Sequence, residues 1–209
     1  SQNYRKSQEL FLDAEYFLMF EDYSDALPFY LQLFKDYPEN FNIAHKIGLC
    51  YLNIPGQKSQ SIQYLEAAAR NAAADYREGS LKQMTAPYIA WFDLANAYRI
   101  NYQFDKAKET FKRYRETLLS EDTDNILFID HQIIVCDNAR ELISTPVEFS
   151  AENLGEQFND SNSNFLPILS GDGNSLAYMS SLKFYDAVFF ARKSKNRWSG
   201  PINVTPDIQ

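Results

Sequence analysis

Apolar residues follow a helical rhythm through the first two thirds of the chain and an alternating rhythm after about residue 145. Residues 10–40, 44–71 and 91–118 share one layout, in which two apolar runs are separated by a short polar turn. Apolar residues that recur every three to four positions are typical of amphipathic helices. The pattern therefore predicts three helical hairpins followed by strands, in a chain that is mainly α.

Small and bulky residues recur at matching places in the three hairpins. In the first helix of each, a small residue precedes an aromatic one by three positions: Ala14 and Phe17, Gly48 and Tyr51, Ala95 and Tyr98. In the second helix, a small residue precedes a large one by four: Ala26 and Tyr30, Ser61 and Leu65, Ala107 and Phe111. A small residue where two helices cross admits the bulky side chain of the other. Because one hairpin cannot bury its apolar face alone, we expect the hairpins to stack as a solenoid.

Local signals predict where some of these helices begin and end. Ser24 is expected to cap the second helix of the first hairpin, with Pro28 in its first turn, where a missing N–H costs little. The insertion that starts at Asn71 is expected to extend a helix up to a break at residues 85–87. Residues 123–143 predict a last helix that seals the end of the solenoid.

After Pro146 the spacing becomes that of short strands joined by turns. Strands are predicted at residues 147–150, 165–170, 176–181, 185–193 and 198–204, with a polar loop at 151–164. Gly171 and Gly173 are free to take positive φ in the turn before the third strand, and Asp172 can accept hydrogen bonds from nearby backbone N–H groups. The C-terminal part is therefore expected to be all β.

Charge, hydropathy and cysteine content limit the kinds of partner and chemistry to expect of this chain. The formal net charge is −8, so nucleic acid is a poor partner, because no counterions would be released from its phosphates. No apolar run approaches the about 18 residues that a membrane helix needs. Cys50 and Cys136 lie far apart inside helical patterns and are expected to be buried free thiols, with a disulfide as the alternative. The sequence begins with Ser and shows no signal-peptide core, so we expect a mature form.

The recurring small, aromatic and bulky positions resemble the tetratricopeptide repeat over residues 7–121. In that register the three repeats open at Leu10, Ala44 and Trp91. The second repeat departs from the pattern, because Ser61 replaces the usual Ala and its turn is one residue longer. The resemblance implies a helical solenoid whose concave face, lined by the first helix of each repeat, binds protein or peptide segments.

The C-terminal part resembles the first blade of a TolB-type β-propeller. The matching residues are Pro167, Ser170, Asp172, Gly173, Leu176, Tyr178, Ser180, Asp186, Val188, Phe190, Trp198, Ser199 and Pro201. A single blade leaves its sheet edges and faces uncovered, so we expect further blades beyond Gln209. The two resemblances divide the chain into a repeat solenoid with a capping helix at 1–145 and a partial blade at 146–209.

The order of these two parts resembles that of periplasmic lipoproteins of Bacteroidetes that join tetratricopeptide repeats, a TolB-type propeller and an OmpA-like domain. PorE-like proteins of the type IX secretion system belong to this group. The resemblance implies a non-catalytic interaction scaffold in the periplasm, associated with the outer membrane and with other envelope or secretion proteins. Contact with peptidoglycan or the membrane would come only through a C-terminal domain and a lipid anchor outside this sequence. The alternative is a glycan or peptidoglycan recognition module that uses the intact propeller.

The resemblance also implies which residues line the protein-binding groove. The expected lining residues are Phe11, Glu15, Leu18, Met19, Asn42, His45, Leu49, Asn53, Phe92, Asn96, Arg99, Ile100, Leu127, His131 and Ile134. The best-known peptide mode of such repeats clamps a C-terminal carboxylate with Lys, Asn and Arg. Glu15 stands at a corresponding position and would repel a carboxylate, which argues against that mode.

Candidates for metal binding and catalysis are sparse. His45 and His131 are the only histidines, and no third ligand lies close to either in sequence, so no metal site is predicted. Residues 160–164 begin with the spacing of a calcium loop but lack its Gly and its later Glu. Because no nucleophile elbow, phosphate loop or apolar carboxylate pair is found, we expect neither an enzyme nor a cofactor.

Overall fold

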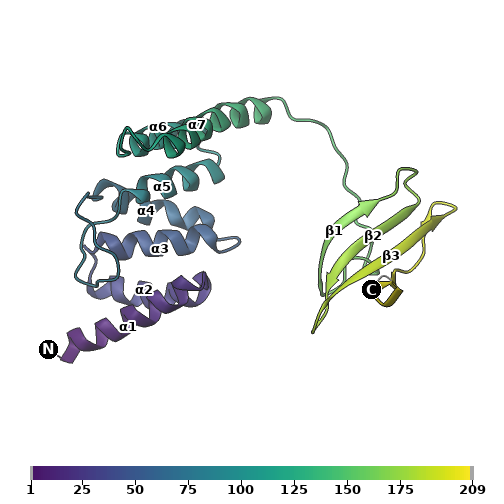
Figure 1. Cartoon of the computed structure of the whole chain (residues 1–209), viewed down its shortest axis with the longest axis horizontal. Coiled ribbons are helices and arrows are strands. Elements are labelled where there is room, and N and C mark those ends of the chain that lie inside the picture. The colour runs from purple at the N-terminus through teal and green to yellow at the C-terminus, as the bar shows by residue number, and fades with distance from the viewer. Residues whose placement is uncertain (1, 208–209) are drawn as a thin grey trace. The chain divides into compact units, whose positions relative to one another are not determined.

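The computed structural model describes residues 2–207, with side chains from residue 4 onward. These residues fall into two compact units that divide between Pro146 and Val147, a helical unit and a β unit (Figure 1). Each unit has a hydrophobic core of its own. Within residues 2–207, none of the helices has the length and apolar character needed to cross a membrane.

Helices make up nearly all of the regular structure before Pro146. They are α1 (Gln2–Met19), α2 (Tyr23–Asp36), α3 (Phe41–Asn53), the short 3-10 helix η1 (Lys58–Gln60), α4 (Ser61–Arg70), α5 (Ile89–Ile100), α6 (Phe104–Arg115) and α7 (Thr123–Ser144). Figure 1 shows them stacked in chain order, and each packs mainly on its neighbours in the chain. The predicted mainly α solenoid of hairpins is confirmed, and α7 ends one residue beyond the predicted capping helix.

The expected pairing of small and bulky residues is found inside the hairpins. Gly48 of α3 faces Leu65 of α4 so closely that a Cβ atom on Gly48 would lie 2.5 Å from the Leu65 Cγ atom. Ala95 and Phe111 are fully buried together in the core that α5 and α6 share. The small residues therefore set the close approach of the paired helices.

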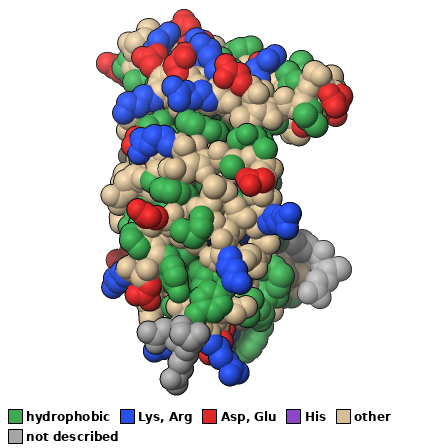
Figure 2. Space-filling model, turned by 90° about the vertical axis from the view of Figure 1, so that its left-hand side faces the viewer, with side chains coloured by type: hydrophobic (Ala, Val, Ile, Leu, Met, Phe, Trp, Pro, Cys, Tyr) green, Lys and Arg blue, Asp and Glu red, His purple; other side chains and the backbone are tan. Residues whose placement is uncertain are grey.

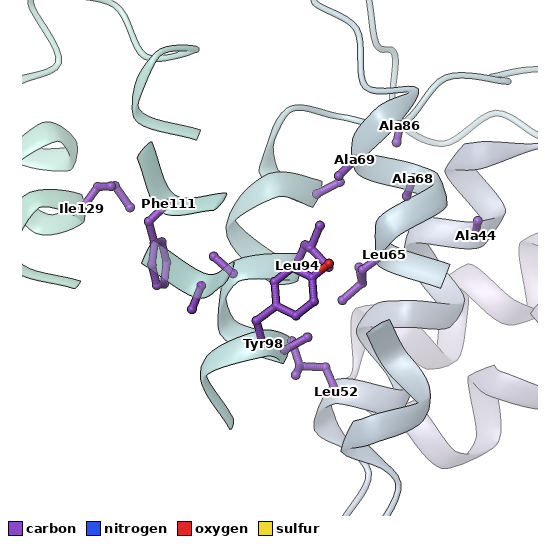
Figure 3. Packing of buried hydrophobic residues seen from close by; sticks show 14 of the residues in the cluster. Ala44, Leu52, Leu65, Ala68, Ala69, Ala86, Leu94, Tyr98, Phe111 and Ile129 are labelled. Atoms are coloured by element: carbon purple, nitrogen blue, oxygen red, sulfur yellow. The ribbon is translucent and has the colours of Figure 1, made fainter. Parts of the chain in front are cut away.

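The core is continuous across the second half of the helical unit. Figure 3 shows Leu94 and Tyr98 of α5 lying between Leu65 of α4 and Phe111 of α6, with Ile129 of α7 beyond. A second core joins α1, α2 and α3. Stacking thus buries faces that no single hairpin could cover, as the solenoid pattern requires.

The insertion between α4 and α5 is a loop, so the predicted extension of a helix beyond Asn71 is wrong. The α4 helix ends at Arg70, and residues 71–88 contain turns and one parallel bridge between Ala72 and Ala86. Leu81 is buried in the α1–α3 core, and the Asn40 Nδ2 atom donates a hydrogen bond to its carbonyl oxygen at 3.0 Å. Contacts with the α1–α3 core, and not the hydrogen bonds of a helix, therefore hold this loop in place.

The start of α2 also differs from the prediction. The helix begins at Tyr23, preceded by Asp22, which makes no side-chain capping bond, so Ser24 is not the cap. Glu21 takes a φ of 59°, and backbone bonds to Phe17 and Leu18 close the turn. Pro28 therefore lies beyond the first turn, inside the helix, where it removes one backbone hydrogen bond.

Ion pairs join the last two helices. Lys108 contacts Asp137 at 2.6 Å, Arg115 contacts Asp130 at 2.7 Å, and Asp105 contacts Arg140 at 2.8 Å. Figure 2 shows charged side chains of both signs gathered over α6 and α7, at the top of the view. The Arg115 guanidinium holds the pKa of Asp130 below its usual range by hydrogen bonding. Since these pairs are partly exposed to solvent, each adds little stability.

The β unit is one antiparallel sheet. Its elements are β1 (Ser163–Leu169), β2 (Ser175–Ser181), β3 (Asp186–Ser194), β4 (Arg197–Trp198), β5 (Ile202–Asn203) and the 3-10 helix η2 (Thr205–Asp207). The strands follow the order β1-β2-β3-β4, and β5 pairs with β3. Tyr178 lies opposite Phe189 in the register, and their rings stack at 5.6 Å. Cross-strand aromatic pairs of this kind stabilise a sheet.

The strand predicted at the start of the β unit is wrong. Residues 147–150 form no strand, and Val147 and Phe149 are exposed, because no neighbouring strand pairs with them. In the turn before β2, only Gly173 takes a positive φ, 69°, whereas Gly171 does not. The polar loop before β1 carries an unexpected core residue, Phe158, whose ring packs against Tyr178 and Trp198.

Candidate functional site

A groove of about 750 Å³ lies among α1, α3, α5 and the loop at residues 71–88. Its lining residues are Glu15, Leu18, Met19, His45, Lys46, Leu49, Tyr76, Glu78, Pro87, Ile89 and Asp93. The first helices of all three hairpins contribute, as expected for the concave face of a helical-hairpin solenoid. We call this site the α1–α3–α5 groove.

The groove brings together part of the predicted set. Glu15, Leu18, Met19, His45 and Leu49 all line it. Their grouping follows from helix geometry, because residues three or four apart on α1 and on α3 share a face. The structure thus places predicted residues of the first two repeats around one hollow.

Phe11 was expected in the groove but lies in the core, with 1% of its surface exposed. Its ring packs edge-on against Tyr30 of α2, with centroids 6.4 Å apart. Asn42 is buried as well, and Asn53 is exposed beyond the groove, where its Nδ2 atom bonds the Leu49 carbonyl oxygen. Each of these three residues lies one helical turn from a lining residue on the same stripe, so its position along the helix axis decides whether it reaches the groove.

The residues predicted from α5 and α7 lie outside this groove. Phe92 packs against the rings of Phe111, Tyr114 and Phe128. Further along α5, the Arg99 Nη2 atom donates to Asn96 at 2.9 Å.

The exposed predicted residues Leu127 and His131 lie on α7, away from the groove lining. The residues that α5 does give to the groove are Ile89 and Asp93, in its first two turns. The predicted Asn96 and Ile100 follow further along the same stripe, beyond the residues that line the groove.

One of the lining residues of the groove is a buried cation. Only 6% of the Lys46 side chain is exposed, and its Nζ atom lies 3.2 Å from Glu15 and 3.7 Å from Glu78. The Tyr30 hydroxyl also donates a hydrogen bond to Glu15. Glu15 thus links α1, α2 and α3, and removal of its charge partners would leave a carboxylate without compensation.

A second polar pair ties α3 to α5. The His45 Nε2–H group donates to the Asp93 Oδ2 atom at 2.8 Å, and both residues are buried. Because an ionised carboxylate can only accept, Nε2 carries the proton, and Nδ1 of a neutral ring is an acceptor. Within the described part of the chain, His45 Nδ1 has no hydrogen-bond partner.

The loop at residues 71–88 forms one wall of the groove. The Tyr76 hydroxyl donates to the Asn42 side-chain oxygen at 3.1 Å, so this buried oxygen is paired. Burial, assisted by the charges of Glu78 and Glu15, raises the pKa of Tyr76 to about 12. Tyr76 therefore stays neutral and hydrogen-bonded at ordinary pH.

Sequence reasoning missed six lining residues: Lys46, Tyr76, Glu78, Pro87, Ile89 and Asp93. Three of them belong to the insertion, which was expected to be helical. Gly79 and Ser80 in that insertion are a turn signal that could have predicted a loop. No sequence signal identified Lys46, because a lysine next to a groove residue on a helix is usually solvated.

The described residues offer little reactive chemistry. Cys50 and Cys136 are free and buried, as predicted, and burial raises the pKa of Cys50 to about 12. Both thiols are therefore protonated at neutral pH and poor nucleophiles. Among residues 2–207, no three His, Cys, Asp or Glu side chains are grouped closely enough to hold a metal ion.

No protein-family model matches the sequence, and a comparison with curated proteins finds no match either. Solved structures do match. The tetratricopeptide-repeat domain of Sgt2 from Aspergillus fumigatus is 19% identical, with a TM-score of 0.48 over 71% of this chain and 87% of that one. The TPR2B domain of yeast Sti1, solved in complex with pHsp70, is 15% identical, with a TM-score of 0.51 over 65% of this chain and 98% of that one. The likeness to the Sti1 domain, together with the stacked hairpins, shows that the helical unit has the fold of a tetratricopeptide-repeat domain.

Proposed function

We propose that the helical unit binds a segment of a partner protein in the α1–α3–α5 groove and that the protein is a non-catalytic scaffold. The observation that carries this proposal is the groove itself, which the first helices of three stacked hairpins line together. Its walls are held by buried polar contacts from Lys46 and His45, so the shape exists before a partner arrives. A preformed site lowers the conformational entropy lost on binding.

The composition of the groove suits a peptide segment. Leu18, Met19, Leu49 and Ile89 offer apolar contacts, while Glu78 and Tyr76 offer polar ones. Specific recognition commonly combines apolar anchors with a few orienting polar groups. The Sti1 TPR2B structure, a complex with pHsp70, supports protein binding as the use of such a fold.

The scaffold works in the periplasm of a bacterium and is associated with the outer membrane. It is part of a secretion or envelope-anchoring complex, of the kind to which PorE-like proteins of the type IX secretion system belong. Support for this location comes from the order of the two sequence resemblances, a repeat solenoid and then a propeller blade. The antiparallel sheet of the β unit agrees with a partial blade, whose neighbouring blades, OmpA-like domain and lipid anchor would lie outside this sequence. Fractionation of the source bacterium with an antibody tests the location, and cytoplasmic recovery would contradict it.

A matched pair of variants tests groove binding. Met19 on the groove and Leu142 on α7 are exposed to nearly the same extent, 70% and 69%. Random peptides are displayed and selected on the purified full chain, and binding of the selected peptides is then measured to Met19→Arg and to Leu142→Arg. We expect Met19→Arg to abolish binding and Leu142→Arg to leave it unchanged. Equal binding to both variants, or selection of no peptide, would contradict the proposal.

A further inference from the structure

We infer that the α1–α3–α5 groove selects a cationic segment, with a Lys or Arg side chain flanked by apolar residues. This inference rests on the proposed function of the groove and names the chemistry of its occupant. It is carried by the balance of charges that line the groove.

Carboxylates outnumber cations along the groove. The lining holds three carboxylates, those of Glu15, Glu78 and Asp93, and one ammonium, that of Lys46. Its formal charge is therefore −2 when His45 is neutral. The chain as a whole is also acidic, with a formal net charge of −8. A hollow lined by one excess sign of charge concentrates ligands of the opposite sign.

The only ammonium of the groove lining is already occupied. Lys46 lies between Glu15 at 3.2 Å and Glu78 at 3.7 Å and is almost fully buried. An anionic ligand would have to displace these carboxylates to reach it, and it would meet their repulsion. Like charges brought together in this way reject a partner, so an acidic segment or a free C-terminal carboxylate is disfavoured.

Glu78 is the carboxylate best placed to receive a cation. Its side chain is 77% exposed at the edge of the groove, whereas Glu15 and Asp93 are tied to internal partners. The distance of 3.7 Å to Lys46 is long for an ion pair, so Glu78 keeps acceptor capacity on its solvent side. A Lys or Arg side chain of the ligand would pair with it.

The remaining wall of the groove is apolar. Leu18, Met19, Leu49, Pro87 and Ile89 line it beside the carboxylates. Lys and Arg carry long aliphatic stems that pack along apolar surface while the charged end reaches a polar group. The groove therefore matches a cation set between apolar side chains better than a run of charges.

The inference is tested on the peptides selected by display on the full chain. Among peptides whose binding Met19→Arg abolishes, we expect Lys or Arg to be enriched between apolar positions. Synthetic versions of one such peptide are compared, with the cation kept, replaced by Gln, or replaced by Glu. We expect weaker binding with Gln, weaker still with Glu, and a loss of affinity as salt is raised.

Glu78→Gln should weaken binding of the cationic peptide about two- to fivefold, as expected for an exposed pair. The matched control Glu141→Gln, an exposed glutamate of α7, should leave it unchanged. Groove-dependent peptides without enriched cations, or with enriched acids, would overturn this inference and keep the proposed function. Absence of any groove-dependent peptide would overturn both.

Discussion

Gly48 and Leu65 mark the closest approach between α3 and α4. A Cβ atom built on Gly48 would lie 2.5 Å from Leu65 Cγ and 2.7 Å from its Cδ2 atom, closer than carbon atoms can pack. The Leu65 side chain is fully buried and cannot swing into solvent. The absence of a side chain at Gly48 is therefore what allows the second hairpin to close.

Gly48→Ala should destabilise the helical unit. In an unconstrained helix this change would stabilise by about 1 kcal/mol, because Ala is the better helix former. Here the extra methyl group overpacks the core, and we expect a net loss of about 1–3 kcal/mol. Denaturant unfolding followed by far-UV circular dichroism measures the change.

The sign of this effect should reverse when the opposing side chain is shortened. Leu65→Ala alone should cost about 2–5 kcal/mol by leaving a cavity. In that background the contacts at 2.5 and 2.7 Å are gone and the nearest atom that remains is the Leu65 backbone N at 3.3 Å, so we expect Gly48→Ala to be neutral or stabilising. A loss of the same size in both backgrounds would show that the contact with Leu65 is not the cause.

Lys46→Met should destabilise the fold through its carboxylate neighbours. The substitution keeps most of the volume but leaves Glu15 without its cation in a largely buried place. Breaking a buried ion pair in this way costs about 3 kcal/mol. Lys35→Met on the exposed face of α2 is the control and should change stability by less than about 0.5 kcal/mol. Adding Glu15→Gln to Lys46→Met should restore part of the loss, and equal stability of the two Lys variants would refute the ion-pair role.

Alkaline conditions should weaken the helical unit. The ordinary pKa values of a Cys thiol and a Tyr hydroxyl are 9.0 and 10.0, whereas burial raises the pKa of both Cys50 and Tyr76 to about 12. Above pH 9 the unfolded chain releases these protons while the folded chain holds them. Stability is therefore full below pH 9 and is lost as pH rises toward about 12.

Tyr76→Phe should reduce the loss of stability that begins near pH 10, because the variant lacks the buried hydroxyl whose pKa is raised. The free energy of unfolding measured at a series of pH values checks it, with the exposed Tyr102→Phe as the control. An unchanged slope in Tyr76→Phe would mean that this hydroxyl does not cause the decline.

The two thiols should be protected until the chain unfolds. Cys50 and Cys136 are buried on α3 and α7, and only the thiolate of an accessible cysteine reacts quickly. We expect labelling by a chromogenic thiol reagent to be at least about a hundredfold slower in buffer than in denaturant. In denaturant the reagent should label both thiols. Fast labelling of either residue under native conditions would show that its helix opens readily.

Phe158→Ala should unfold the β unit. Phe158 lies under Tyr178 and Trp198 in a small core, and truncation of a buried Phe costs about 3–5 kcal/mol. Amide hydrogen exchange of β2 and β3 measures the loss of protection. The exposed Phe184 in the β2–β3 turn provides the matched control, Phe184→Ala, for which we expect protection to be unchanged.

Much of the helical unit follows from the sequence by itself. Small residues such as Gly48 and bulky ones such as Leu65 recur at positions that only paired helices make compatible, so the hairpins and their order could be predicted. The alternating spacing after Pro146 likewise predicted β1, β2 and β3, because side chains of a strand alternate between its two faces. These features depend on residues that lie close together in the chain, so the spacing of residue types along the sequence predicts them.

Only the tertiary structure decided the composition of the groove. The period of a helix shows which residues share a stripe, but the packing of neighbouring helices decides that Asp93 of α5 faces the groove and that Phe92 and Phe11 do not. The loop at residues 71–88 takes its course from the burial of Leu81 and the hydrogen bond from Asn40, contacts that link positions far apart in the chain. Lys46 became buried for the same reason, since Glu15 and Glu78 reach it from other elements. The sequence thus determined the repeating helical frame and the short strands, whereas long-range packing determined which side chains meet in the groove, because such contacts leave no period in the sequence.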